Sequence, residues 1–260
     1  MRKFVKFFLW AVLILEIVSI FMMLCALNQL GSDLNNFNYP PFQHQPKKEP
    51  EKEVKNNIIL PPEEKKPVIL PEKFLIENVP FVVQSPDSVW DEKGEESCEE
   101  VSMMIVDHFW TKKPLDRKIA LLERNKLIDF EINTYGDFRD ENAQQVAQRL
   151  KDYFGYQNVE IVYDFSLQDL KWKIIEGRPI IVPAAGRMLN NPYFTQPGPL
   201  YHNLVVIGYE GKNIIVNDPG IGRGKGYRYN EDIFYDAIHD FPGSKERITE
   251  GRKAMIIVKQ

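Results

Sequence analysis

Apolar residues in the C-terminal part of the chain recur with the periods of helices and strands. From Val101 to Phe109 they recur at i, i+3, i+4 and i+8, which predicts a helix with one apolar face. Ser97 and Glu100 both precede this run. They have the spacing of a capping box, S-x-x-E. The pattern therefore predicts a helix whose first residue is Cys98.

A second pattern predicts an antiparallel hairpin. Two runs rich in β-branched residues, 203–209 and 213–216, flank a short turn that contains a glycine. Folding the chain about this turn brings the residue before the first run opposite residues 218–220, depending on turn length and bulges. We therefore predict that His202 and Asp218 meet at the open end of one hairpin.

The same periods predict the other elements of this part of the chain. The amphipathic runs indicate helices over 114–127, 142–154 and 166–177, with a late helix over 230–241. The β-branched runs indicate strands over 158–164, 178–185 and 253–259, and a short strand that ends at Gln84.

The N-terminal residues differ from the rest of the chain. Residues 7–27 are apolar apart from Glu16, and about 20 such residues span a bilayer as a helix. We interpret Glu16 as tolerated rather than functional. Three basic residues precede the run and the first charge after it is Asp33, which predicts a cytoplasmic N-terminus. A cleaved signal peptide is the alternative, but no small-x-small cleavage site follows the run.

Composition divides the chain into three parts. Residues 1–30 form the cytoplasmic tip and the anchor. Residues 31–73 hold eight of the 18 prolines, together with Lys/Glu clusters, which predicts a disordered tether. Residues 74–260 have the length of one globular domain, which would lie outside the membrane. The net charge of -4 argues against a nucleic-acid partner.

The two cysteines of the chain limit its redox and metal chemistry. Cys25 lies in the predicted membrane segment and Cys98 in the exported domain, so neither an intrachain disulfide nor a cysteine-based zinc site is expected. Cys98 is either a buried, inert thiol or a nucleophile. The helix N-terminus favours its thiolate, whereas four flanking glutamates oppose ionisation. A nucleophilic Cys98 therefore needs a nearby imidazolium.

One of the four histidines fits that need. His44 lies in the tether, and His108 lies about 15 Å farther along the helix of Cys98. His239 ends the predicted late helix, where a structural role is favoured. His202 remains as the candidate base for Cys98.

Asp218 and Gln84 complete the candidate site. Asp218 would orient the imidazole of His202, although Asp218-Pro219-Gly220 could also simply form the turn after the strand. Gln84 could complete an oxyanion hole with the Cys98 backbone N–H, although taken alone it would be read as a surface glutamine.

At these residues the chain resembles a known family. The segments NVPFVVQSP, SCEEVSMM, GRPIIVPA, YHNLVVIGY and NDPGIGRGKGYRY occur in the family's order. They are similar to segments of papain-like cysteine peptidases of the branch related to bacteriocin-leader (double-glycine) peptidases. The chain departs from the leader peptidases at Glu99, where a glycine often follows the cysteine.

The resemblance implies an α+β, papain-like fold, with the cysteine helix packed on an antiparallel sheet that bears the histidine. It also implies Cys98 as nucleophile, His202 as general base, Asp218 as orienting residue and Gln84 as oxyanion donor. No metal or cofactor is expected. Aromatic residues near this site are candidates for lining a substrate cleft, or for pinning down the loop over 186–201. They are Trp90, Tyr193, Phe194 and Tyr201.

The expected activity is that of a membrane-anchored, extracytoplasmic thiol peptidase or amidase that acts on a peptide or protein. Two alternatives remain at this point. A transglutaminase-like acyltransferase would use the same residues and pass the acyl group to an amine. A non-catalytic, anchored module would hold a peptide in the same cleft without cutting it.

Overall fold

The structure, a computed structural model, describes residues 69–259. The predicted membrane segment and most of the predicted tether lie outside these residues. Within 69–259, no helix has the length and apolarity needed to cross a membrane.

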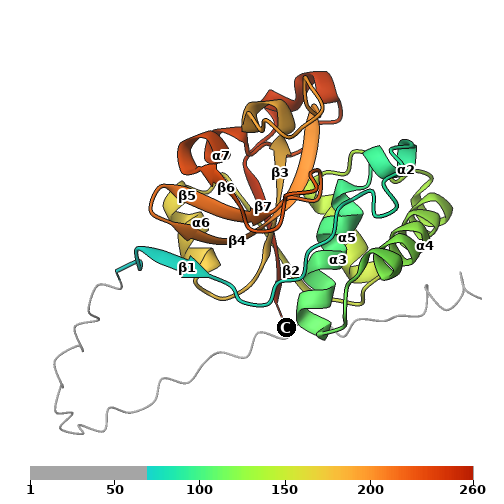
Figure 1. Ribbon diagram of the computed structural model, residues 1–260, viewed down its shortest axis with the longest axis horizontal. Coiled ribbons are helices and arrows are strands. Elements are labelled where there is room, and N and C mark those ends of the chain that lie inside the picture. Colours follow the sequence, from blue (N-terminus) through green and yellow to red (C-terminus); the bar gives the residue numbers. More distant parts are fainter. Residues whose placement is uncertain (1–68, 260) are drawn as a thin grey trace, which may run out of the picture. The chain divides into compact units, whose positions relative to one another are not determined.

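Helices and strands alternate irregularly along the described chain (Figure 1). The helices are α2 (Glu92–Glu95), α3 (Cys98–Thr111), α4 (Arg117–Tyr135), α5 (Ala143–Asp152), α6 (Leu167–Ile174) and α7 (Glu231–Ala237), with 3-10 turns η1 (Gly186–Leu189) and η2 (Lys245–Glu250). The strands are β1 (Lys73–Leu75), β2 (Asn158–Tyr163), β3 (Ile180–Ala185), β4 (Tyr201–Glu210), β5 (Asn213–Asn217), β6 (Tyr227–Asn230) and β7 (Ala254–Lys259).

The strands form one antiparallel sheet in the order β2-β7-β3-β4-β5-β6, and β1 pairs with the end of β4. The hairpin of β4 and β5 is the predicted one, and its turn residue Gly211 has a φ of 55°, a left-handed conformation that suits glycine. A register shift between Val206 and Gly208 marks a bulge in β4. The predicted strands β2, β3 and β7 are also confirmed, and together they make this an α+β fold.

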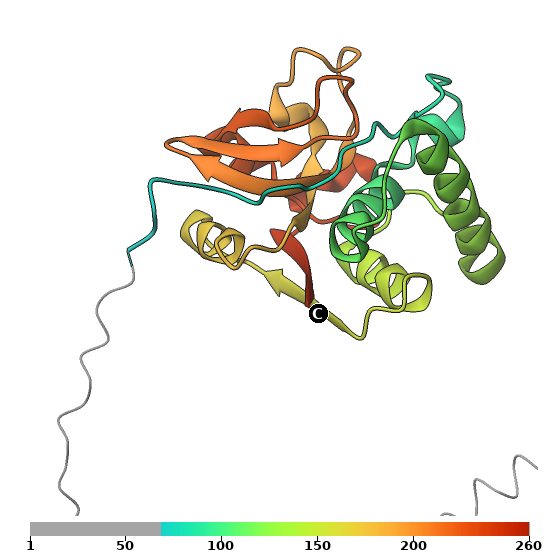
Figure 2. The same cartoon turned by 60° about the horizontal axis from the view of Figure 1, so that its bottom comes forward.

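Both faces of the sheet are covered, which explains why its central strands are apolar without alternation. Ile181 of β3 packs into a cluster with α3, α4 and α5, while Ile180 and Val182 pack on the other face with α6 and α7. Figure 2 shows α3, α4 and α5 (green) grouped on one side of the sheet. Burying a large aliphatic side chain contributes about 1.5–3 kcal/mol, so the first of these clusters, which includes Val101 and Ile105, holds α3 firmly against the sheet.

Helix α3 begins where the sequence predicts, but its cap differs from the prediction. The Ser97 hydroxyl makes no capping bond and instead donates to the Gln84 backbone carbonyl at 3.2 Å. Glu100 is fully buried and does not reach back to the N-cap. The capping-box prediction was therefore wrong. The Ser97 hydroxyl bonds to another segment, and the Glu100 side chain is buried in the interior instead of reaching the N-cap.

The other differences concern segments without strong periodicity. Residues 79–84 form no strand; the Gln84 backbone N–H instead donates to the Pro219 carbonyl at 2.9 Å. Helix α4 continues well past the predicted residue 127 and ends at Gly136, whose φ is 89°. Strand β6 and the short helix α2 were not predicted, and β6 exists because it pairs with β5.

Candidate active site

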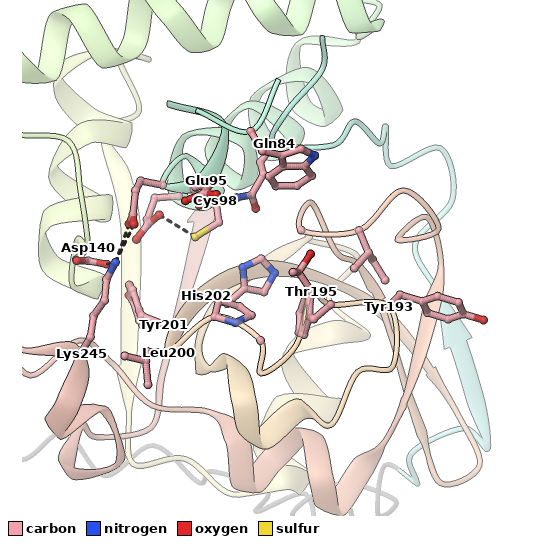
Figure 3. Close-up of a pocket in the computed structure, with 18 of the residues that line it drawn as sticks. Gln84, Glu95, Cys98, Asp140, Tyr193, Thr195, Leu200, Tyr201, His202 and Lys245 are labelled. Atoms are coloured by element: carbon pink, nitrogen blue, oxygen red, sulfur yellow. Dashed lines mark hydrogen bonds and ion pairs between the residues drawn. The ribbon is translucent and has the colours of Figure 1, made fainter. Parts of the chain in front are cut away.

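A cavity of about 660 Å³ opens where the start of α3 faces the start of β4 (Figure 3). Three segments far apart in the sequence supply most of its walls: residues 84–99, residues 193–202 and residues 220–222. It contains Cys98, His202 and Gln84, and all four predicted aromatic residues line it: Trp90, Tyr193, Phe194 and Tyr201. The fold thus brings together side chains that the sequence separates by more than a hundred residues.

Cys98 is the first residue of α3, and its sulfur points into the space above His202 (Figure 3). The side chain is buried, and the thiol donates a hydrogen bond to Glu99 Oε2 at 2.9 Å. Burial raises the pKa of the Cys98 thiol well above its usual value, and the neighbouring Glu99 charge raises it further. In this resting arrangement the thiol is protonated.

His202 lies at the start of β4 and is oriented by Asp218, just beyond β5. The His202 Nε2 to Asp218 Oδ1 distance is 2.7 Å, and both side chains are buried. Because an ionised carboxylate only accepts, Nε2 carries the proton and donates it to Asp218. The other ring nitrogen, Nδ1, is then free to accept a proton from a thiol.

Asp218 is ionised even though it is completely buried. Burial alone would raise its pKa, but the charge of His202 and hydrogen bonds from His202, Tyr229 and Gly220 lower it below the usual value. The Tyr229 hydroxyl donates to Asp218 Oδ2 at 2.6 Å, and the Gly220 N–H donates to Oδ1 at 2.9 Å. These donors replace the water that a carboxylate needs.

The sequence did not single out Tyr229 and Asn191, which extend this network. Asn191 Nδ2 donates to the Tyr229 hydroxyl at 2.5 Å, which leaves that hydroxyl hydrogen for Asp218. Tyr229 lies on β6 opposite Ile214 of β5. Its segment is one of those that resemble the family, but only the folded structure shows that its side chain lies beside Asp218.

Gln84 lies at the cavity but differs from its predicted arrangement. Its amide nitrogen donates to the backbone carbonyls of Gly94 at 3.1 Å and Glu95 at 2.8 Å. Both amide hydrogens are therefore used, and Oε1 is buried without a partner in the described part of the chain. Arg124, a buried residue of α4, fixes the Gln84 backbone by donating to its carbonyl at 2.8 Å.

The predicted cleft aromatics divide into two kinds. Trp90 and Tyr193 are about half exposed, so they offer free surface to a ligand. Phe194 packs edge-on against His202 with ring centroids 5.5 Å apart, and Tyr201 donates its hydroxyl to the Glu141 carbonyl at 2.7 Å. Phe194 and Tyr201 are therefore wall residues that hold the imidazole and the strand in place.

The end of the cavity opposite Tyr193 is polar (Figure 3). Lys245 of η2 pairs there with Glu96 at 2.8 Å and with Asp140 at 3.1 Å. No pattern in the sequence indicates this group, because its members lie in three separate segments. Within residues 69–259, no group of three or more His, Cys, Asp or Glu side chains is arranged to hold a metal ion.

The other described histidines are engaged elsewhere. His108 is buried, with Nε2 2.6 Å from Glu123 Oε2, and His239 Nδ1 lies 2.8 Å from the Gly251 carbonyl. Neither lines the cavity. This leaves His202 as the imidazole beside Cys98 in the described chain.

The sequence matches a known protein family over most of the described residues. The model of the Peptidase_C39-like family matches residues 76–241, which include Cys98, His202 and Asp218. No curated protein matches the sequence.

Several solved structures are distantly similar to the chain. A structure described as a C39-like peptidase from Bacillus anthracis is 17% identical, covers 73% of this chain and 99% of its own, and has a TM-score of 0.48. The Carica candamarcensis cysteine protease CMS1MS2 is 14% identical over 73% of this chain and 99% of its own, with a TM-score of 0.43. Xylellain, a cysteine protease from Xylella fastidiosa, is 16% identical over 74% of this chain and 87% of its own, with a TM-score of 0.36.

Proposed function

The chain belongs to the Peptidase_C39-like family and is a cysteine peptidase, and we propose that it cleaves peptide or isopeptide amides with Cys98, His202 and Asp218. The observation that carries this assignment of roles is the buried His202–Asp218 pair, 2.7 Å apart, in the same cavity as the Cys98 sulfur. It orients Nδ1 as a base and stabilises the imidazolium that forms when His202 accepts a proton.

In the first step the thiol proton moves from Cys98 to His202 Nδ1, and the sulfur attacks the amide carbonyl carbon. A carbon–sulfur bond forms while the carbonyl π electrons move onto the oxygen. Asp218 keeps its negative charge throughout and stabilises the imidazolium, since three hydrogen bonds, from His202, Tyr229 and Gly220, favour its ionised form.

The developing oxyanion needs hydrogen-bond donors near the start of α3. The Cys98 backbone N–H is one, because the first N–H groups of a helix have no partner within the helix. Gln84 is the second in this proposal, but its amide must exchange one of its two carbonyl contacts for the substrate oxygen. The longer contact, 3.1 Å to Gly94, is the one we expect to be exchanged.

In the second step His202 gives its proton to the leaving amine, and the carbon–nitrogen bond breaks. Water then attacks the thioester with His202 again acting as base, which releases the acid and restores the thiol. Trp90 and Tyr193, half exposed at the cavity, would contact substrate side chains.

We place this activity outside the cytoplasmic membrane. The support is the sequence alone: an apolar run over 7–27, three basic residues before it, and a proline-rich segment between it and the domain. Protease added to intact cells should then release the domain by cutting within residues 31–73. Protection of the domain until the cells are lysed would reverse this orientation.

Turnover of a quenched fluorescent peptide library tests the assignment of roles. Wild-type protein should cleave a subset of the peptides, and Cys98→Ala should abolish cleavage of the same subset. Addition of a labelled amine distinguishes the acyltransferase, which would incorporate the label in preference to hydrolysis. Unchanged cleavage by Cys98→Ala would remove Cys98 from the mechanism.

A further inference from the structure

Glu99 is the side chain that touches the sulfur in the resting structure. Its Oε2 lies 2.9 Å from Cys98 Sγ, and the carboxyl group is almost completely buried at the wall of the cavity. A charged carboxylate at this place would oppose formation of a thiolate, since like charges at this separation repel strongly away from water. The role of Glu99 therefore depends on whether it carries a proton.

The surroundings of Glu99 favour its neutral form. Burial raises the pKa of Glu99 to about 8, and the charges of Glu141 and Asp140 also raise it. The titratable and charged groups that face it are Cys98 and Glu100 on α3, Glu131 on α4, Asp140 and Glu141 before α5, and Tyr201 on β4. The nearest cations are committed elsewhere: Arg149 pairs with Glu141, and Lys245 pairs with Glu96 and Asp140.

Backbone contacts indicate which oxygen of neutral Glu99 holds the proton. The Glu141 backbone N–H donates to Glu99 Oε1 at 3.3 Å, so Oε1 is the carbonyl oxygen. The hydroxyl is then Oε2, the oxygen that faces the sulfur. While the thiol is protonated, Oε2 accepts its hydrogen; once the sulfur is a thiolate, the same oxygen can donate.

We propose that Glu99 is a further catalytic residue, which as a neutral carboxylic acid donates a hydrogen bond from Oε2 to the Cys98 thiolate. The proposal rests on the function proposed above. In the step, the thiol proton moves to His202 Nδ1, and the Glu99 hydroxyl hydrogen turns toward the sulfur without leaving Oε2. No bond other than S–H breaks, and the thiolate gains a donor in a place where solvent has little access.

The proposal predicts results opposite to those expected if Glu99 acted only through its charge. Glu99→Gln keeps a donor toward the sulfur and an acceptor toward the Glu141 N–H, whereas Glu99→Ala removes both. If Glu99 acted only as a repelling anion, both substitutions would speed up thiolate chemistry. If it acted only as a packing residue, both would slow it in step with their loss of stability.

Iodoacetamide alkylation of Cys98 reads the thiolate without any knowledge of the substrate. We would use the full chain in detergent, with the Cys98 peptide followed by mass spectrometry so that Cys25 does not contribute. At pH 7, Glu99→Gln should react within about threefold of wild type, and Glu99→Ala about tenfold more slowly, the effect of losing one hydrogen bond to a charged group. Faster reaction of both variants would overturn the proposal.

Peptide turnover against pH supplies the second measurement. Wild-type kcat/KM should fall as pH rises past about 8, where Glu99 ionises beside the sulfur. Glu99→Gln should lack this alkaline decline. The matched control is Glu131→Gln. Glu131 is another buried carboxyl group, its pKa is raised to about 9, and it does not line the cavity. The Glu131→Gln variant should therefore keep the alkaline decline in kcat/KM.

The outcomes separate this proposal from the one it rests on. Loss of turnover in Cys98→Ala, together with an alkaline decline that persists in Glu99→Gln, would overturn the role of Glu99 and leave the peptidase mechanism standing. Should Glu99→Gln fail to fold by thermal melting, Glu99→Asp becomes the test. Its shortened carboxyl should slow alkylation toward the Glu99→Ala rate, and a wild-type rate would contradict the proposal.

Discussion

The two walls of the cavity each bury carboxyl groups, but in opposite states of ionisation. On the sheet wall, Asp218 is fully buried and its pKa is lowered; on the helix wall, Glu99 is equally buried and its pKa is raised to about 8. Asp218 receives hydrogen bonds from His202, Tyr229 and Gly220, whereas Glu99 faces the thiol, one long backbone contact and other carboxyl groups. Burial therefore does not decide the charge of a carboxyl group here; the number of donors around it does.

The helix wall continues this pattern away from the cavity. Burial also raises the pKa of Glu100 well above its usual value, and the charge of Glu131 raises it further. Burial and the charge of Glu141 raise the pKa of Glu131 to about 9. Glu141 pairs with Arg149, yet burial still raises its pKa to about 7. Glu99, Glu100 and Glu131 are thus largely neutral at neutral pH, which lowers the repulsion that a Cys98 thiolate would otherwise meet.

Replacing one carboxyl group on each wall with an amide of the same shape should give the largest difference in kcat/KM. Asp218→Asn should lower kcat/KM by about 10³ to 10⁴, because an amide at this position can hold His202 in the wrong tautomer and cannot stabilise its charge. Glu99→Gln should lower it by less than about threefold at pH 7. The two variants would be compared on one fluorogenic peptide, and equal losses would contradict the difference in charge between the two walls.

The pH dependence of stability should follow the helix wall. Glu99 and Glu131 have folded pKa values above the unfolded value, so the folded state binds more protons between about pH 4.3 and 8, and stability falls as pH rises. Each group contributes about 1.4 kcal/mol per pH unit at most, and we expect the free energy of unfolding to be at least about 3 kcal/mol lower at pH 8 than at pH 5.5. Urea unfolding at both values measures it.

Asp218 does not add to that slope, because a lowered folded pKa contributes stability that is lost only below about pH 4. Glu131→Gln serves as the control and should make the slope shallower by up to about 1.4 kcal/mol per pH unit. A stability that rises between pH 5.5 and 8 would mean that these carboxyl groups are ionised in the folded protein.

Removal of one donor from Asp218 should have a smaller effect than removal of its charge. Tyr229→Phe deletes the 2.6 Å hydrogen bond to Oδ2 and leaves the bonds from His202 and Gly220. We expect kcat/KM to fall about tenfold, with the acid limb of its pH profile moved upward, since one bond to a charged group contributes about 1.5–3 kcal/mol. A profile of unchanged shape would show that Tyr229 only packs beside Asp218.

Parts of the site close in sequence were predictable from pattern alone. Cys98 was placed at the first residue of its helix from the apolar spacing and the S-x-x-E pattern, and the helix begins there although the capping box does not form. His202 and Asp218 were brought together because one hairpin joins them, and a hairpin follows from β-branched runs around a glycine turn. The cap at Ser97 and the strand at Gln84 were predicted wrongly, because each is decided by contacts with distant segments.

By itself, then, the sequence determined most of the helices and strands, the candidate nucleophile and the pair that faces it, since periodicity and turn residues act over a few positions of the chain. Only the tertiary structure decided three contacts. Tyr229 donates a hydrogen bond to Asp218, the Gln84 amide donates to two backbone carbonyls, and Glu99 contacts the Cys98 sulfur. The same holds for charge. Four glutamates around Cys98 read as four negative charges in the sequence, but burial in the folded protein raises the pKa of Glu99 and Glu100.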